Sequence, residues 1–249
     1  MENKLDFTIE ELSMNAWPAI STVLYDGWVA RLSGGYANRG NSISPIYPSR
    51  LRLEEKLDFC DRLYARHGLP ANYKLTNGEE HKHIDEMLDK LKYKKIHETS
   101  IQVCQLREPP GRIADGIAIA DDFSGPWMDS VIEFNRIAEK DVPAFRKIVG
   151  NIAVEKFAVL KEAGGRIVGC GYGAVDGGYV GVYDIVVKEA ERGKGYGREI
   201  VEAILSEAYR RGVRKSYLQV MLNNAVAWKL YEKLGYREIY QYWYRKKEG

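Results

Sequence analysis

The sequence contains few cysteines, no marked excess of either charge and no long apolar run. Its three cysteines, Cys60, Cys104 and Cys170, are far apart and lack the spacing of metal ligands. This pattern argues against a disulfide framework and against a cysteine-based metal site. We therefore expect reduced, buried thiols in a cytosolic protein that holds no metal.

Charge is nearly balanced, with 37 lysines and arginines against 35 aspartates and glutamates and a formal net charge of +2. That balance gives no electrostatic basis for binding nucleic acid. No N-terminal stretch approaches the length of a signal peptide or a membrane span, so we expect a soluble, cytoplasmic protein without a membrane partner. A chain of 249 residues is long enough for one large domain or two small ones.

The most informative segment is Arg192-Gly193-Lys194-Gly195-Tyr196-Gly197, which lies between an apolar run and an amphipathic helix that opens near Arg198. Glycines let the backbone approach a phosphate closely and present several N–H groups to it. The first turn of the helix adds free N–H groups and partial positive charge, and Arg192, Lys194 and Arg198 add cationic side chains. The segment predicts a diphosphate cradle, with a plain tight connection as the alternative.

Two other nucleotide-binding motifs fit these letters less well. A P-loop closes with a Lys-Ser or Lys-Thr pair, whereas Lys194 is followed by Gly195. A Rossmann fingerprint needs a third glycine at the position where Arg198 stands.

The pattern Arg-x-x-Gly-x-Gly over residues 192–197 resembles the pyrophosphate-binding signature of the GNAT superfamily of acetyl-CoA-dependent acetyltransferases. Residues 218–236, LQVMLNNAVAWKLYEKLGY, are similar to the family's next segment, in which a strand leads to an asparagine and a later tyrosine. Asn224 and Tyr231 match that spacing, and Leu234-Gly235-Tyr236 resembles the family's Leu-Gly-Phe/Tyr ending.

The resemblance implies an α/β (α+β) GNAT fold, with a central mixed, mostly antiparallel sheet flanked by helices. In the back half of the chain, periodicity predicts the matching order of elements, namely a strand over 113–120, helical stripes over 127–138 and 142–149, strands over 156–161, 166–175 and 179–188, a helix from 198, a strand over 216–220, a helix over 224–234 and a strand over 237–244. Glycine pairs at 164–165 and 177–178 favour hairpins between the three middle strands.

The front half resembles, in outline only, the degenerate GNAT-like domain that precedes the working domain in two-domain members. We predict domains at 1–110 and 111–249, joined by the linker Pro109-Pro110-Gly111. Where a cradle would stand, the front domain has Ser-Pro-Ile-Tyr-Pro-Ser over 44–49, and its two prolines remove N–H donors. We therefore expect one coenzyme site. His81 and His83 point to different faces of a predicted helix and are interpreted as surface residues.

By the same resemblance, acetyl-CoA is the co-substrate. The strand before the glycine segment would pair its main chain with the pantetheine arm, and Asn224 would hydrogen-bond that arm. Tyr231 would protonate the leaving sulfur, since a phenol with a pKa of about 10 is protonated at neutral pH, or it would simply pack in the core. The residues expected to bind the coenzyme are Ile185, Val186, Val187, Arg192, Gly193, Lys194, Gly195, Tyr196, Gly197, Arg198 and Asn224.

The general base is the least defined of the expected groups. Many family members carry a glutamate on this strand, but Gly181 stands at the matching position and the nearest carboxylate is Asp184. Asp184 is the candidate, although strand alternation directs it to the face opposite Tyr183 and Ile185, where it would bond the backbone or a surface cation. A water chain, or deprotonation of the amine before it binds, would serve equally well.

These expectations describe an N-acetyltransferase that moves an acetyl group directly from acetyl-CoA to a primary amine in a ternary complex, since the sequence shows no convincing Cys-His pair for an acyl-enzyme. A coenzyme-binding sensor or interaction module without turnover is the alternative. The acceptor, a small molecule or a peptide, is not readable from the sequence, nor is the oligomeric state, for which a homodimer is one option. We expect the front domain to wall the acceptor site, with Arg31, Tyr36 and Arg39 lining it or lying on plain surface.

Overall fold

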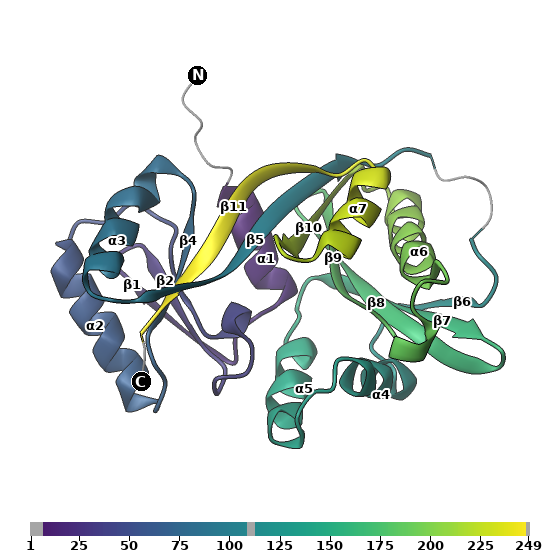
Figure 1. Cartoon of the computed structure of the whole chain (residues 1–249), viewed down its shortest axis with the longest axis horizontal. Coiled ribbons are helices and arrows are strands. Elements are labelled where there is room, and N and C mark those ends of the chain that lie inside the picture. The colour runs from purple at the N-terminus through teal and green to yellow at the C-terminus, as the bar shows by residue number, and fades with distance from the viewer. Residues whose placement is uncertain (1–6, 109–112, 248–249) are drawn as a thin grey trace.

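The computed structural model describes residues 7–108 and 113–247. The strands of these residues form one continuous sheet in the order β1-β2-β3-β4-β11-β5-β10-β9-β8-β7-β6, and helices flank it (Figure 1). The predicted α+β architecture with a mixed sheet is thus confirmed. The predicted linker Pro109-Pro110-Gly111 lies outside the described residues.

The front half of the described chain, residues 7–108, places two helices against its part of the sheet and a third near the centre of the molecule. Its elements are α1 (Phe7–Ala16), β1 (Ser21–Tyr25), β2 (Trp28–Leu32), the 3-10 helix η1 (Asn38–Gly40), β3 (Ile43–Pro45), α2 (Leu53–Arg66), β4 (Asn72–Thr76), α3 (Glu79–Lys90) and β5 (Lys94–Gln105). Between β1 and β2, Asp26 and Gly27 adopt φ angles of 40° and 79°, which make the tight turn of a hairpin.

The back half, residues 113–247, follows the order of elements expected from periodicity. It contains β6 (Ile117–Ala120), α4 (Gly125–Phe134), η2 (Glu139–Asp141), α5 (Val142–Gly150), β7 (Glu155–Ala163), β8 (Arg166–Asp176), β9 (Tyr179–Val187), η3 (Glu189–Glu191), α6 (Tyr196–Arg210), β10 (Lys215–Met221), α7 (Ala225–Lys233) and β11 (Arg237–Lys246). Strands β7, β8 and β9 are antiparallel neighbours, as the two glycine pairs predicted.

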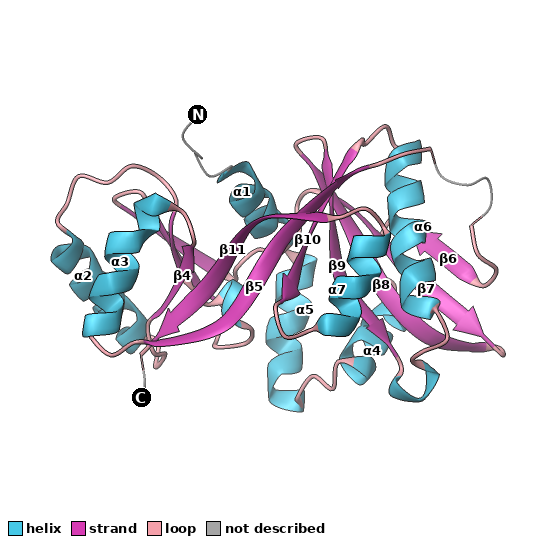
Figure 2. Cartoon of the chain, turned by 45° about the horizontal axis from the view of Figure 1, so that its top comes forward, coloured by secondary structure: helices cyan, strands magenta, loops and turns pink. Residues whose placement is uncertain are grey.

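The two halves exchange strands at the centre of the sheet. Strand β5 of the front half lies between β10 and β11 of the back half, antiparallel to both, and β11 in turn pairs with β4. Figure 2 shows β5 and β11 running as long neighbouring strands from one half to the other. The division of the chain into domains at residue 110 stays a prediction, because this exchange carries the sheet across it.

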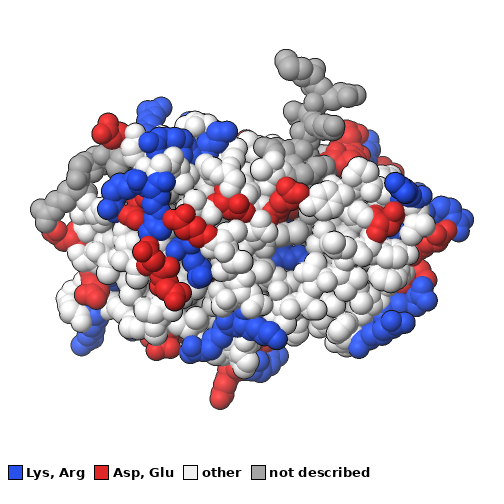
Figure 3. Space-filling model, turned by 180° about the vertical axis from the view of Figure 1, so that it is seen from behind, with Lys and Arg blue, Asp and Glu red and all other residues white. Residues whose placement is uncertain are grey.

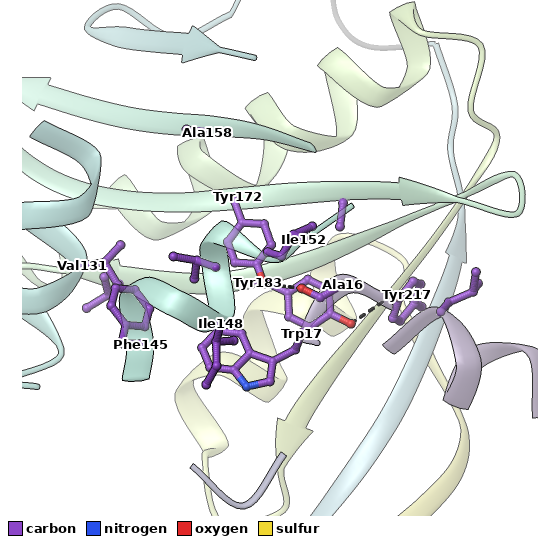
Figure 4. Packing of buried hydrophobic residues seen from close by; sticks show 14 of the residues in the cluster. Ala16, Trp17, Val131, Phe145, Ile148, Ile152, Ala158, Tyr172, Tyr183 and Tyr217 are labelled. Carbon is purple, nitrogen blue, oxygen red and sulfur yellow. Dashed lines mark hydrogen bonds between the residues drawn. The ribbon is translucent and has the colours of Figure 1, made fainter. Parts of the chain in front are cut away.

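Two apolar clusters cover opposite faces of the back half. One packs α4 and α5 of the back half together with α1 and Trp17 of the front half, and the other packs α6 and α7. Figure 4 shows the first cluster, in which Trp17 lies close to Ile148 and Phe145. The N-terminal helix is therefore part of the core of the back half, although it comes first in the chain.

His81 is buried, which corrects its interpretation as a surface residue; it is only 4% exposed. Its Nδ1 accepts a hydrogen bond from the main-chain N–H of Thr76 at 2.9 Å, and its Nε2 lies 2.7 Å from the main-chain oxygen of Pro45. Burial lowers the pKa of His81, which favours the neutral ring. The imidazole thus bridges the parallel strands β3 and β4, which pair directly only at Ile43 and Tyr73.

Candidate active site

The parallel strands β9 and β10 separate before their carboxyl ends. Their pairing runs from Tyr179 opposite Lys215 to Val182 opposite Leu218 and then stops. Beyond that point, residues 183–187 of β9 keep an edge that no longer pairs with β10 within the described chain. The glycine segment follows β9 and Asn224 follows β10, so both lie at the same end of the sheet, where ligands of open α/β sheets bind.

A β-bulge lies at the start of this opening. Gly171 of β8 faces both Asp184 and Ile185 of β9, because Tyr172 pairs with Tyr183 and Cys170 with Val186. A Cβ on Gly171 would lie 2.4 Å from Ile185 Cδ1, so a larger residue opposite the bulge would require the Ile185 side chain to shift. The extra residue shifts which side chains of β9 point to each face of the sheet.

The expected orientation of Asp184 is therefore wrong. Tyr183 packs with the cluster under α4 and α5, whereas Ile185 packs with the cluster under α6, so these two side chains do not share a face. Asp184 has a φ of 49° and lies on the side of Tyr183 and Tyr172. The Asp184 charge raises the pKa of Tyr172, and Arg39, the partner of Asp184, lies over the Tyr183 ring. Simple alternation missed this because a bulge leaves no periodic signal in the sequence.

The glycine segment has the backbone of an anion cradle. Gly193 and Gly195 adopt φ angles of 80° and 89°, and a Cβ at either would meet no atom within 4 Å. None of the five consecutive main-chain N–H groups of residues 193–197 donates to an acceptor in the part of the chain that the structure describes. These residues are exposed or half-buried and lie at the N-terminus of α6, an arrangement that favours a phosphate.

The three cations of the segment are held by their neighbours. Lys194 pairs with Glu191 at 2.7 Å and Arg198 with Glu202 at 2.8 Å, while Arg192 Nε donates to the main-chain oxygen of Val187 at 3.3 Å. The Lys194 and Arg198 side chains are 53% and 55% exposed. Such exposed pairs are weak, so a bound anion can compete for both cations.

Asp184 shares a partly buried ion pair with the front half. Arg39 Nη2 lies 3.6 Å from Asp184 Oδ1, and the two side chains are 30% and 12% exposed. Burial raises the pKa of Asp184, and the Arg39 charge only partly offsets that rise. Asp184 Oδ2 has no hydrogen-bond partner among the described residues. A carboxylate with a raised pKa and a free oxygen is suited to accept a proton.

Gly181, the position at which the resemblance led us to look for a glutamate, leaves no room for a side chain. A Cβ on Gly181 would lie 2.5 Å from the Tyr183 ring and 2.6 Å from Tyr217 Oη. The Tyr183 and Tyr217 hydroxyls bond each other at 2.9 Å, as Figure 4 shows. The Tyr183 and Tyr217 side chains therefore fill the space that a side chain at Gly181 would enter.

Tyr231 and Asn224 both lie on the side of α7. Tyr231 is 8% exposed and packs against Tyr236, with ring centroids 5.8 Å apart. Burial raises the pKa of Tyr231 to about 12, so its hydroxyl is protonated at neutral pH. Asn224 accepts a hydrogen bond from the main-chain N–H of Ala227 at 3.1 Å and so caps α7. Its amide N–H₂ group stays free to donate elsewhere.

Tyr36 and Arg39, two of the front-half residues expected either to line the acceptor site or to lie on plain surface, lie near Asp184. Arg39 and Tyr36 come from the loop around η1, and Arg39 stacks over Trp17 with 4.5 Å from Cζ to the ring centroid. Burial, together with the Asp184 charge, raises the pKa of Tyr36 to about 12. The only available signal was the composition of this loop, which does not reveal where a loop docks.

Three further features concern the cysteines, clusters of metal-ligating side chains and the length of the helices. All three cysteines are buried, and burial raises the pKa of Cys104 to about 11 and that of Cys60 to about 12. The described residues contain no group of three or more histidine, cysteine, aspartate or glutamate side chains that could hold a metal ion. Among the described helices, none has the length and apolar character needed to cross a bilayer.

Comparison with known proteins gives matches to acetyltransferases. Residues 120–236 match the model of the acetyltransferase (GNAT) family. The uncharacterized N-acetyltransferase YobR of Bacillus subtilis is 26% identical over 96% of this chain and 97% of its own length.

Solved structures of similar fold span both halves. A GCN5-related N-acetyltransferase from Kribbella flavida has a TM-score of 0.67 at 15% identity, covering 97% of this chain and 93% of its own. A tandem GNAT protein from the clavulanic acid biosynthesis pathway has a TM-score of 0.61 at 13% identity, covering 84% of this chain and 76% of its own. These matches identify a GNAT acetyltransferase domain over residues 120–236, within a fold that solved structures share across both halves.

Proposed function

We propose that this protein is an acetyl-CoA-dependent N-acetyltransferase that acetylates a primary amine by direct transfer in a ternary complex. The observation that carries this proposal is the row of five unsatisfied N–H groups at residues 193–197, next to the open edge of β9. Residues 193–195 are exposed and residues 196–197 are half-buried, so the row is open to a ligand. Free N–H groups at a helix N-terminus favour an anion, and a diphosphate supplies several acceptor oxygens.

Acetyl-CoA would supply the activated thioester, and the residues of this chain would bind it and move the protons. The N–H groups of 193–197 would hold the diphosphate, and the main chain of 185–187 would pair with the arm and polarise the thioester carbonyl. Asp184 would accept a proton from the attacking amine, while Tyr231 would donate one to the departing thiolate. The carbon–nitrogen bond forms as the carbon–sulfur bond breaks, which leaves an amide and a free thiol.

Direct transfer is favoured over a covalent acyl-enzyme by the state of the cysteines. A nucleophilic thiol needs a lowered pKa and access to the substrate. Cys60, Cys104 and Cys170 are instead buried, with raised pKa values.

A non-catalytic coenzyme sensor is the second candidate, favoured by Gly181, which leaves no room for the glutamate that the resemblance led us to look for. Replacing Tyr231 with phenylalanine separates the two. If Tyr231 is the acid, Tyr231→Phe should lower kcat by about 10² to 10⁴-fold with little change in acetyl-CoA affinity, measured as thiol release with a panel of amines and as calorimetric binding.

Tyr209→Phe is the matched control, because Tyr209 lies against Arg214 at the C-terminal end of α6, the end opposite the glycine segment. It should leave kcat unchanged. Wild-type protein that binds acetyl-CoA but releases no thiol with any amine would favour the sensor instead.

A further inference from the structure

Arg31 is a buried cation without an anionic partner. It lies on β2 and is 6% exposed, and no carboxylate in the described part of the chain forms an ion pair with it. Its guanidinium donates to the main-chain oxygen of Trp17. Lys74, a cation of similar burial, has Glu10 at 2.7 Å. Burying an unpaired guanidinium is costly, and burial lowers the pKa of Arg31 to about 10.

Trp17 brings a second arginine next to the first. Its carbonyl accepts from Arg31, and Arg39 lies over its ring at 4.5 Å. Trp17 is 2% exposed, yet its indole Nε1 has no hydrogen-bond partner among the described residues. Tyr244 is close enough to feel the charges of both Arg39 and Arg31, which lower its pKa against the larger effect of burial. These groups form one cluster of donors between the two halves.

This cluster adjoins the candidate base and reaches solvent. Arg39 also lies over the Tyr183 ring at 5.7 Å and 3.6 Å from Asp184, and its side chain is 30% exposed. Figure 3 shows an isolated basic group recessed between the two halves, with uncharged residues around it. Arg31, Arg39 and Asp184 together carry a net charge of +1. The charge of Glu10 also acts on Arg31, but Glu10 is paired with Lys74, so the count is unchanged. The net positive charge and the unpaired indole N–H of Trp17 therefore favour one added negative charge.

We propose that the amine acceptor carries a carboxylate, as a free amino acid does, and that Arg31, with Arg39 and the indole N–H of Trp17, binds that carboxylate while Asp184 faces the amine. This inference rests on the proposed function, because it names the acceptor of that reaction. An amino acid with a neutral amine has a charge of −1, which matches the cluster. Guanidinium groups also bind carboxylates in a planar, two-point geometry that an amide cannot reproduce.

The test uses the full chain saturated with coenzyme A. Calorimetric titration compares the proteinogenic amino acids with their α-carboxamides, and thiol-release assays with acetyl-CoA follow on both series. At least one amino acid should bind about 10- to 100-fold more tightly than its amide, because a charged hydrogen-bonded contact is lost in the amide. Arg31→Met should remove that preference, while Arg62→Met, an exposed arginine on α2, should retain it.

Two milder variants keep the test decisive if Arg31→Met does not fold. Arg31→Lys keeps the charge but loses the planar fork, and Trp17→Phe keeps a ring beneath Arg39 but loses the indole N–H. Both should reduce the preference for acid over amide. Carboxylate-selective binding without acetylation would support this inference and refute the proposed function. Equal use of acids and amides, or no carboxylate-dependent binding in the series, would overturn the inference.

Discussion

The position of Asp184 at the β-bulge determines which residues surround its carboxylate. Its positive φ turns the carboxylate toward Arg39, a residue of the other half of the molecule. The sequence indicates Asp184 as the nearest carboxylate to the glycine segment, but its environment depends on a bulge and on a docked loop. Neither leaves a local pattern, so the partner of Asp184 was not predictable.

Removing the Arg39 charge should shift the pH dependence of the reaction. An opposite charge at this distance lowers a carboxyl pKa by about 1 to 3 units, so Arg39→Gln should raise the pKa of Asp184 further. A base must be deprotonated to act, and the acidic limb of kcat/KM should therefore move to higher pH by about one unit or more. The same amine is used for both proteins, so that its own titration cancels. An unmoved limb would argue for a water chain in place of Asp184.

At the level of the elements, Asn224 has two expected roles at the start of helix α7, as the helix cap and as a coenzyme ligand. The helix has nine residues and begins at Ala225, and the side chain of the preceding residue, Asn224, caps it. The sequence predicted this helix because its apolar spacing and its cap are local signals. It predicted the hairpins around β8 for the same reason. Strand β11 was also predicted, yet its pairing with β5 and β4 of the front half was not, because pairing between remote segments has no local signature.

Two substitutions should separate the capping role of Asn224 from coenzyme binding. Asn224→Asp keeps an oxygen for the Ala227 N–H but loses the amide donor, so stability should hold while acetyl-CoA binds more weakly. Asn224→Ala should lose both, with a fall of about 1 kcal/mol in the free energy of unfolding. Thermal unfolding and calorimetry on both variants test this. An aspartate variant that binds acetyl-CoA like the wild type would leave Asn224 a helix cap alone.

At the level of the whole molecule, the halves depend on each other. The sheet of the back half includes β5, and the cluster under α4 and α5 includes α1 and Trp17. The sequence predicted a working domain and a degenerate one, but not that the first would need strands and a core helix from the second.

This dependence makes the predicted domain boundary testable. A fragment of residues 111–249 lacks β5, which leaves β10 and β11 without their common neighbour. We expect it to be unfolded or insoluble, because the unpaired edges expose main-chain donors and acceptors. A fragment of residues 94–249 restores β5 and should yield more soluble, structured protein, as judged by circular dichroism. Cooperative unfolding of the shorter fragment would instead establish residue 110 as an autonomous boundary.

The most direct measurement of the central claim is calorimetric titration of acetyl-CoA into the wild type, Gly195→Ala and Gly212→Ala. Gly195 and Gly212 lie at opposite ends of α6 with φ angles of 89° and 88°, and a Cβ at either meets no atom within 4 Å. Both substitutions therefore impose the same backbone strain, but only one disturbs the cradle. We predict one-to-one binding to the wild type and to Gly212→Ala, with affinity at least about tenfold weaker for Gly195→Ala, since about 1.4 kcal/mol of lost contact suffices. Absence of binding to the wild type, or equal binding to all three proteins, would contradict the account.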